Sequence, residues 1–372
     1  MSKLNIAFLS VFYPFRGGIA QFNNELLLSL RAHAKIQAYN FSRQYPKLLF
    51  PGKTQLVDNQ DLDPNVNAIP VLDSINPFSF SRASKIINKD APDIVITSYW
   101  MPFFGPALGW ALGGVNAKKV ALLHNVEPHE KRFFDDAFNK YYLSKNDAFI
   151  VLSDTVKNQL LKYKPNAKYI QIPHPVYSHF GDILDKADSK KKLKINPSRK
   201  VILFFGFIRK YKGLDLLIHA LTNYDQEYTL LIAGESYEDD QILNNQLKEA
   251  GVEGEKLCKH IKYIPDEEVK LYFSASDVCV LPYRSATQSG IAAIAKHFEV
   301  PMVVTPVGEL PNEVKHLHDG FVCDDVSPAS IQRGIIEVLK RQDEFQVNTR
   351  FDNQENTFDS FGTKLSDFFN QL

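Results

Sequence analysis

Residues 201–213 read VILFFGFIRKYKG, an apolar run that ends in a basic turn between two glycines. The apolar part has the length and composition of a buried strand, and the residues from Leu214 to Leu221 have the spacing of a buried helix face. A strand, a short turn and a helix make one unit of a parallel α/β sheet. This stretch therefore favours an α/β fold.

Strand-like runs of the same kind recur along the chain and fall into two sets. The first set comprises Leu4–Ser10, Ile94–Ser98, Val120–His124, Ala148–Leu152 and Tyr169–Ile172. The second set comprises Val201–Phe205, Thr229–Ala233, Ile261–Ile264, Val278–Leu281 and Met302–Thr305. A chain of 372 residues commonly forms two domains, and each set is large enough for one doubly wound domain. We predict domains at residues 1–180 and 181–350, with the polar, lysine-rich segment Gly181–Lys200 at the boundary, and an amphipathic C-terminal helix within 351–372.

The overall composition is that of a globular protein with balanced charge. Lys plus Arg and Asp plus Glu both total 43, so the net charge gives no reason to expect a nucleic-acid partner. The three cysteines, Cys258, Cys279 and Cys323, fit neither a disulfide framework nor a zinc site by number and spacing. A reducing, cytoplasmic compartment is therefore favoured.

The most apolar stretch, Tyr99–Val115, is interrupted by proline and glycine and is shorter than the roughly 20 residues of a membrane-spanning helix. Spanning is not expected, whereas peripheral contact with the inner membrane face stays open. The aromatic run Tyr99–Phe104 and Trp110 fit such contact and buried packing equally well. The residues from Met1 to Ser10 are expected to form a core strand rather than a signal peptide.

The basic turn is the first candidate site. Arg209 can present a planar pair of donors to a phosphate and Lys212 a point charge. Gly206 and Gly213 allow a close approach of the backbone. Two cations at the carboxyl end of a strand favour a diphosphate ligand, and the alternative is a basic surface turn without a ligand.

The second candidate site follows strand Val278–Leu281. Residues 282–290 lead into a helix of small apolar residues, which Gln288 or Ser289 is expected to start. Unpaired amides at a helix N-terminus attract anions, and the small Ser289 and Gly290 leave room for one. The alternative is an ordinary helix cap made by the same residues.

Two further candidates lie in the first domain. Gly17 and Gly18 form a glycine turn without the G-x-G-x-x-G spacing of a dinucleotide site, so a plain strand-to-helix turn is an equal alternative. His124 ends a predicted strand where α/β domains present ligand groups, although a satisfied structural histidine is the alternative. A metal is not expected at the nearby His129 and Glu130, because their spacing matches no zinc motif.

Together these segments resemble glycosyltransferase family 4, whose members have the GT-B fold of two Rossmann-like doubly wound domains facing across a cleft. The similarity covers nearly the whole chain and is most specific in the second domain. The motifs that appear there in the family's order are Phe205–Leu214, Leu231–Glu235, Ser276–Val278 and Pro301–Gly308.

The resemblance implies a role for each candidate. Arg209 and Lys212 would hold the donor diphosphate. The Gly17–Gly18 turn would approach it, and His124 would line the donor-sugar site as the first catalytic candidate. The residues beside the nucleoside would be Gly234, Glu235, Ile264 and Pro265. The C-terminal helix would pack against the first domain.

One departure from the family pattern concerns the donor site. Many members carry a pair of glutamates, one near the donor sugar and one near the ribose, where this chain has Ala286 and Ile294. Neither side chain can perform that role. Glu309 and Glu313 are the candidate substitutes, and Glu313 matches a common family position.

The expected function is the transfer of a sugar from a nucleotide-diphosphate donor to a glycan or lipid-linked acceptor. Retention of configuration follows from the family, and no metal or cofactor is expected beyond the nucleotide sugar as co-substrate. The segment with Thr287 and Gln288, two candidate sugar contacts, resembles a variant seen in cell-surface polysaccharide assembly. The alternatives are a nucleotide-sugar epimerase of the same fold and a non-catalytic subunit that binds nucleotide or a partner. A dehydrogenase is disfavoured because the G-x-G-x-x-G motif is missing.

Overall fold

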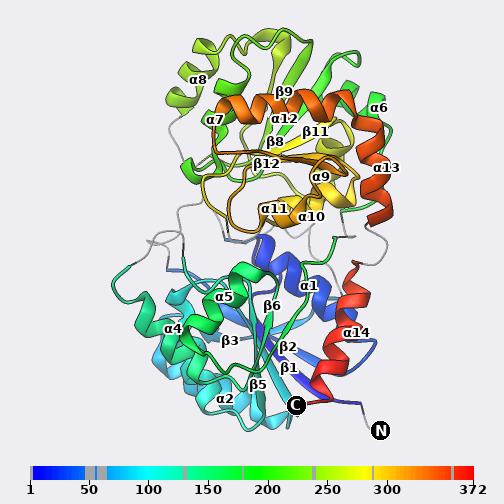
Figure 1. Ribbon diagram of the computed structural model, residues 1–372. Coiled ribbons are helices and arrows are strands. Elements are labelled where there is room, and N and C mark those ends of the chain that lie inside the picture. Colours follow the sequence, from blue (N-terminus) through cyan, green and yellow to red (C-terminus); the bar gives the residue numbers. More distant parts are fainter. Residues whose placement is uncertain are drawn as a thin grey trace. The chain divides into compact units, whose positions relative to one another are not determined.

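The computed structural model describes residues 3–46, 55–56, 65–128, 132–177, 180–236, 240–286, 289–352 and 356–372. The chain divides into two compact units (Figure 1). Unit 1 comprises Met1–Pro175 with Asn356–Leu372, and unit 2 comprises Val176–Glu355. The sequence analysis placed the corresponding boundaries at residues 180 and 350.

Unit 1 is built on a parallel sheet with the strand order β3-β2-β1-β4-β5-β6-β7. Its strands are β1 Asn5–Ser10, β2 Lys35–Arg43, β3 Ala68–Asp73, β4 Ile94–Tyr99, β5 Lys118–Leu123, β6 Ala148–Val151 and β7 Tyr169–Gln171. Its helices are α1 Gly18–Leu30, α2 Pro77–Lys89, η3 Pro102–Phe104, α3 Gly105–Gly113, α4 Asp135–Ser144, α5 Asp154–Tyr163 and α14 Phe358–Phe369. The chain winds outward from β1 in both directions, which makes the sheet doubly wound.

Unit 2 repeats this plan with the order β10-β9-β8-β11-β12-β13, again all parallel. Its strands are β8 Lys200–Phe205, β9 Tyr228–Ala233, β10 Leu257–His260, β11 Val278–Leu281, β12 Met302–Val304 and β13 Gly320–Val322. Its helices are α6 Lys186–Lys192, η4 Lys210–Lys212, α7 Leu214–Ala220, α8 Asp240–Glu249, η5 Gly254–Lys256, α9 Asp266–Ser274, α10 Gly290–His297, α11 Leu310–Glu313, α12 Pro328–Lys340 and α13 Gln342–Asp352. Counted within each unit, both sheets begin with the Rossmann order 3-2-1-4-5-6.

Helix α14 closes unit 1 by packing on α1, and the two helices lie side by side in Figure 1. The Ser29 hydroxyl of α1 donates a hydrogen bond of 2.7 Å to the carbonyl of Phe358. The ring of Phe22 meets the rings of Phe358 and Phe361 edge to face. The chain therefore returns to its first unit at the C-terminal end.

The prediction of one strand is wrong. The run Ile261–Ile264 lies beyond the edge strand β10, which is formed instead by Leu257–His260. Strand β10 lies at the edge of the sheet and is only partly buried, so it needs few apolar residues. The prediction therefore selected the more apolar run that follows it. The other expected strands overlap observed strands.

Two further segments differ from their simplest interpretation. The lysine-rich boundary segment contains α6, in which the Lys190 side chain is buried and donates to Asp277 at 3.1 Å. In the aromatic run, Tyr99 and Phe104 are buried in the core of unit 1, so buried packing accounts for them. Trp110 of α3, in contrast, is exposed.

Candidate active site

The basic turn connects β8 to α7 at the carboxyl edge of the unit 2 sheet. Gly206 and Gly213 both have positive φ, of 100° and 68°. A Cβ atom on Gly213 would lie 2.0 Å from the carbonyl oxygen of Pro282, so only glycine permits this approach. The turn is therefore pressed against the loop that follows β11.

Lys212 is the most informative side chain of the turn, because only 9% of its surface is exposed. Its Nζ donates to the hydroxyl of Tyr283 at 3.2 Å and lies 5.0 Å from the centroid of the same ring. Burial lowers the pKa of Lys212, and the charge of Arg209 contributes in the same direction. A buried ammonium has three donors and needs compensating negative charge, so this position is suited to an anion.

Arg209 precedes η4 in an extended conformation and is exposed at the same edge of the sheet. Both cations belong to the turn that follows β8, and the charge of Arg209 lowers the pKa of Lys212. The sequence prediction that these residues stand together at the end of a strand is therefore met by the geometry. Their ligand is a separate question.

Helix α10 begins beside this turn. Ser289 is its N-cap, and within the described residues the Ser289 side chain makes no capping hydrogen bond to the helix amides. Its hydroxyl lies 3.4 Å from that of Tyr283. A Cβ atom on Gly290 would find its nearest neighbour, the Tyr177 hydroxyl, at 4.0 Å. Among the described residues, the first turn of α10 thus has room for a ligand, whereas the predicted sugar contacts Thr287 and Gln288 lie outside the described residues.

The loops after β9 and β10 reach the same edge. Gly234 has φ 144°, and a Cβ atom there would lie 2.0 Å from the carbonyl oxygen of Gly206. The amide of Ile208 donates to the carbonyl of Glu235 at 2.8 Å. Ile264 is buried just before Pro265, the N-cap of α9. Gly234 and Glu235 are therefore in direct contact with the basic turn, whereas Ile264 and Pro265 lie on the loop between β10 and α9.

The two substitute carboxylates have different surroundings. Glu313 is paired with Lys296 of α10 at 2.5 Å. Glu309 is buried and accepts a hydrogen bond of 3.0 Å from Asn312. A Cβ atom on Gly308 would lie 1.5 Å from the carbonyl oxygen of Ala286. Gly308 therefore contacts Ala286, the position of the first glutamate in the family, and Glu309 is the next residue in the chain.

The candidates of unit 1 lie around α1. Gly17 is the N-cap of α1 with φ 114°, and a Cβ atom on Gly17 or Gly18 would meet no atom of the described residues within 4 Å. His124 follows β5 with 2% of its surface exposed, and its ring lies 4.8 Å from that of Phe22. Burial lowers the pKa of His124 to about 3, and the neighbouring His174 contributes. His124 is therefore a neutral imidazole at physiological pH.

Sequence reasoning missed Tyr283 and Arg284, which follow β11 directly. Tyr283 contacts Lys212, and Arg284 forms an ion pair with Asp215 of α7. Their position after a central strand was the available signal, because loops at this edge present ligand groups. Their contacts with Lys212 and Asp215 depend on which strands are neighbours in the sheet, and a single sequence does not give this strand order.

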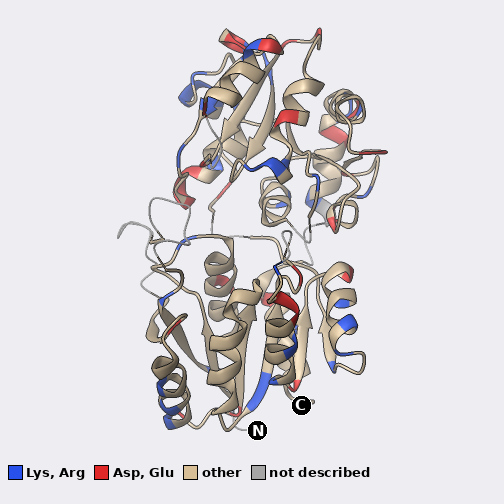
Figure 2. Cartoon of the chain, turned by 90° about the vertical axis from the view of Figure 1, so that its left-hand side faces the viewer, with Lys and Arg blue, Asp and Glu red and all other residues tan. Residues whose placement is uncertain are grey.

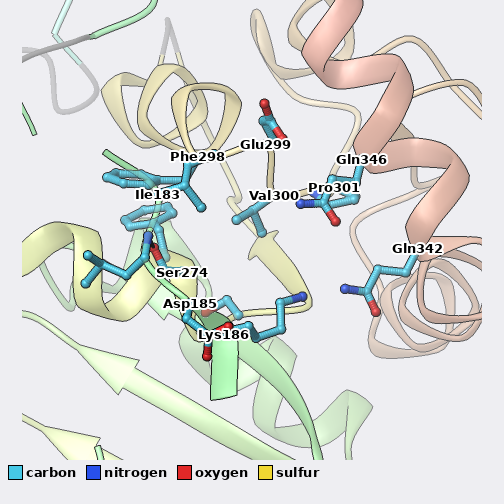
Figure 3. Close-up of a pocket in the computed structure, with 13 residues that line it drawn as sticks. Ile183, Asp185, Lys186, Ser274, Phe298, Glu299, Val300, Pro301, Gln342 and Gln346 are labelled. Atoms are coloured by element: carbon cyan, nitrogen blue, oxygen red, sulfur yellow. Dashed lines mark hydrogen bonds between the residues drawn. The ribbon is translucent and has the colours of Figure 1, made fainter. Parts of the chain in front are cut away.

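A cavity of about 210 Å³ lies at the opposite edge of the unit 2 sheet (Figure 3). It is lined by Ser276, Val300 and Pro301, which precede β11 and β12. Its polar side chains include Lys186 and Gln342, both of which donate to Asp277. The cavity is therefore separate from the basic turn, and its polar groups already serve a structural network.

Three further observations concern the distribution of charge, metal ligands and membrane spans. Basic and acidic residues are interspersed over both units (Figure 2), in agreement with the equal totals. Within the described residues, no three His, Cys, Asp or Glu side chains are grouped as metal ligands. In the same part of the chain, no helix is long and apolar enough to cross a bilayer.

The fold and the loops at its carboxyl edges define a protein of two Rossmann-like domains. A family model described as Glycosyltransferase Family 4 matches residues 16–179, and one described as Glycosyl transferases group 1 matches residues 185–356. The chain therefore belongs to the glycosyltransferases of the GT-B fold, and the expected enzyme class and fold are confirmed.

Individual relatives agree with this assignment. An uncharacterized glycosyltransferase of Methanocaldococcus jannaschii is 20% identical over 92% of this chain and 90% of its own length. The lipopolysaccharide core biosynthesis mannosyltransferase LpsB of Rhizobium meliloti is 26% identical over 46% of this chain and 48% of its own length. The crystal structure of Anabaena HepE in complex with UDP-glucose superposes with a TM-score of 0.79 at 14% identity, covering 99% of this chain and 100% of HepE.

Proposed function

We propose that this glycosyltransferase transfers a sugar from a nucleotide-diphosphate donor to a glycan or lipid-linked acceptor in cell-surface polysaccharide synthesis. The observation that carries the proposal is the burial of the Lys212 ammonium beside the N-terminus of α10. An ammonium in such a place is stable only with an anion or an electron-rich partner nearby. A diphosphate would supply the anion.

The chemical step follows from the charges at this edge. Cleavage of the bond between sugar and phosphate leaves negative charge on the departing diphosphate. Lys212, Arg209 and the backbone amides at the start of α10 would stabilise that charge in place of a metal. Preorganised donors of this kind contribute about 3 kcal/mol each to lowering a barrier. Neutral His124 would line the donor-sugar site, and the reaction would retain the anomeric configuration.

The relatives support the class of donor and acceptor. HepE is described in complex with UDP-glucose, and LpsB is described as a lipopolysaccharide core mannosyltransferase. A nucleotide sugar and a surface glycan are therefore the substrates to test first. The sugar and the base are left to experiment.

Exposed aromatic residues support peripheral contact with a membrane that carries the acceptor. The exposed fractions are 89% for Phe78, 53% for Trp110 and 98% for Phe133. They belong to α2, to α3 and to the residues just before α4, and α3 contacts both other helices. Exposed Lys85 and Lys140 lie on α2 and α4. Aromatic rings with basic neighbours favour an anionic lipid surface.

The donor test is a thermal-shift panel of UDP-, GDP- and ADP-sugars with excess chelator. A donor at about 100 times its dissociation constant should add about 2.7 kcal/mol to the free energy of unfolding. Transfer with the selected donor should continue in the chelator. Activity that disappears in chelator and returns only with magnesium or manganese would overturn the metal-independent mechanism, and an inverted product anomer would overturn retention.

The membrane test is flotation with anionic liposomes. The wild-type protein should float, and replacing Trp110 and Phe133 with serine should reduce the floating fraction. Val347→Ser, at a residue of α13 with 47% exposure, is the matched control and should behave as wild type. Wild-type protein that stays entirely in the soluble fraction would contradict membrane contact.

A further inference from the structure

The hydroxyl of Tyr283 lies between the two elements that would bind the diphosphate. It accepts a hydrogen bond of 3.2 Å from Lys212 Nζ, and it is 3.4 Å from the hydroxyl of Ser289. The Lys212 ammonium also lies 5.0 Å from the centroid of the Tyr283 ring. All three side chains are buried. Tyr283 therefore joins the turn after β8 to the first turn of α10.

Of the other groups near Lys212, Tyr211 and Cys279 raise its pKa and Arg209 lowers it. Arg209 on the same turn is a second cation, and Tyr211 lies beside it. Cys279 belongs to β11, and burial raises the pKa of its thiol to about 12, so the thiol is neutral at physiological pH. Among the described residues, the hydrogen-bond acceptor of Lys212 is the Tyr283 hydroxyl.

We propose that Tyr283 is a positioning residue that keeps the Lys212 ammonium charged and directed toward a diphosphate at the start of α10. The inference rests on the proposed function, because it requires an anion at Lys212. The hydroxyl oxygen accepts one N–H of the ammonium, and the negative face of the ring attracts the same cation. Both interactions favour the charged form of Lys212 and oppose the effect of burial.

The proposal predicts a pH effect with a definite sign. Burial lowers the pKa of Lys212, so the ammonium loses its proton at a lower pH than an exposed lysine does. Removing the hydroxyl acceptor removes a partner of the charged form and lowers this pKa further. Binding of a diphosphate should then decline at a lower pH in a Tyr283→Phe variant than in the wild-type protein.

The experiment is calorimetric titration of the full chain with UDP and, separately, with inorganic pyrophosphate. Tyr283→Phe keeps the ring and should weaken binding of both probes by about tenfold at neutral pH, the effect of one hydrogen bond to a charged group. The alkaline decline should also move to lower pH. Both changes are expected together, since they have one cause.

Tyr228→Phe is the matched control. The Tyr228 hydroxyl is buried in the same unit and has no hydrogen-bond partner among the described residues. It lies at the amino end of β9, away from the basic turn. This variant should bind both probes as the wild-type protein does, with the same pH dependence.

The outcomes separate this inference from the proposed function. Binding by the wild-type protein together with unchanged affinity and pH dependence in Tyr283→Phe would overturn the role of Tyr283 alone. A wild-type protein that binds neither probe would overturn the proposed function and this inference with it. The wild-type titration provides a test without a variant: affinity that is constant from about pH 7 to about pH 10, below the ordinary lysine pKa, would contradict the proposal.

Discussion

Arg284 binds the carboxylate of Asp215 through two parallel hydrogen bonds, of 2.7 Å from Nη1 to Oδ1 and 2.6 Å from Nη2 to Oδ2. The same guanidinium donates to the carbonyl of Lys210 at 2.8 Å, and the Arg284 amide donates to the carbonyl of Tyr211 at 2.7 Å. Asp215 lies in the first turn of α7. Lys212 belongs to this turn. The pair between Arg284 and Asp215 therefore holds the turn against α7 and against the loop after β11.

Replacing Arg284 with glutamine should weaken UDP binding by about tenfold and lower the free energy of unfolding by about 1 kcal/mol, because a bidentate, partly exposed pair is lost. Calorimetric titration and urea unfolding measure the two effects. Arg333→Gln is the control, since it removes an equally short pair with Asp324 in which both side chains are largely exposed. The control should change stability by less than about 0.5 kcal/mol and leave UDP binding unchanged.

The stability difference between Arg284→Gln and the wild-type protein should depend on pH. Burial alone would raise the pKa of Asp215, but the hydrogen bonds and charge of Arg284 outweigh it and lower this pKa. A lowered carboxyl pKa contributes stability at neutral pH that is lost as the pH falls through the folded-state value. The deficit of the variant should therefore shrink below about pH 4, the ordinary aspartate pKa. A deficit that is constant down to this range would show that the ion pair is not its source.

Lys212→Met should separate stability from ligand binding. Burial disfavours the ammonium, so the variant should gain about 1 kcal/mol in free energy of unfolding at neutral pH while UDP binding weakens about 100-fold. Because the folded-state pKa of Lys212 is lowered, the wild-type protein should become more stable as the pH rises toward the ordinary lysine pKa, and the variant should lack this rise. Wild-type affinity for UDP in both Lys212→Met and Arg209→Ala would refute the assignment of this turn.

The fold was more predictable than the contacts within it. Central strands such as Val201–Phe205 are apolar on both faces and stand out in the sequence, whereas the edge strand Leu257–His260 is partly exposed and carries lysine and histidine. The buried Lys190 likewise could not be predicted from its local sequence. A lysine in a polar run suggests exposure to solvent, whereas Lys190 is buried and donates to Asp277, just before β11, and to the carbonyl of Arg199.

The positions of candidate-site residues were predictable where they follow the end of a strand or start a helix. Arg209, Lys212 and Ser289 could be found because each follows a strand or starts a helix. Tyr283 could not be assigned a role, because its partner Lys212 comes from a different loop, the turn after β8. The contact of Gly308 with Ala286 likewise joins loops that are far apart in the chain.

His124 should make the protein sensitive to acid. The unfolded chain takes up a proton near pH 6.5 that the folded protein accepts only near about pH 3, so stability falls across this window as the pH is lowered. The slope is up to about 1.4 kcal/mol per pH unit for one proton. In urea unfolding, the free energy of unfolding of His124→Asn should fall less steeply across the same window than that of the wild type. His219→Asn, at an exposed position, should show the same slope as the wild type. Equal slopes for wild type and His124→Asn would contradict the neutral, buried state.

The contact between α1 and α14 leaves no room for a side chain at Gly362. A Cβ atom there would lie 2.2 Å from the Ser29 hydroxyl oxygen, which donates to the carbonyl of Phe358. Gly362→Ala should therefore displace this hydroxyl, break its hydrogen bond and lower the free energy of unfolding by about 2 kcal/mol. Gly113→Ala is the control, because a Cβ atom at this end of α3 would meet no atom within 4 Å in the part of the chain that the structure describes. The control should be as stable as the wild type or slightly more stable.

A double-mutant cycle identifies the source of the effect at Gly362. Ser29→Ala alone removes the hydrogen bond and should lower the free energy of unfolding by about 1 kcal/mol. In the double variant the hydroxyl that causes the clash is gone, so the combined loss should be smaller than the sum of the single losses. Strictly additive losses would show that the two residues do not compete for this space. Because Phe22 of α1 contacts both His124 and Phe361 of α14, a change at the α14 contact should also disturb His124. If His124 lines the donor-sugar site as proposed, transfer activity should fall in Gly362→Ala and stay unchanged in Gly113→Ala.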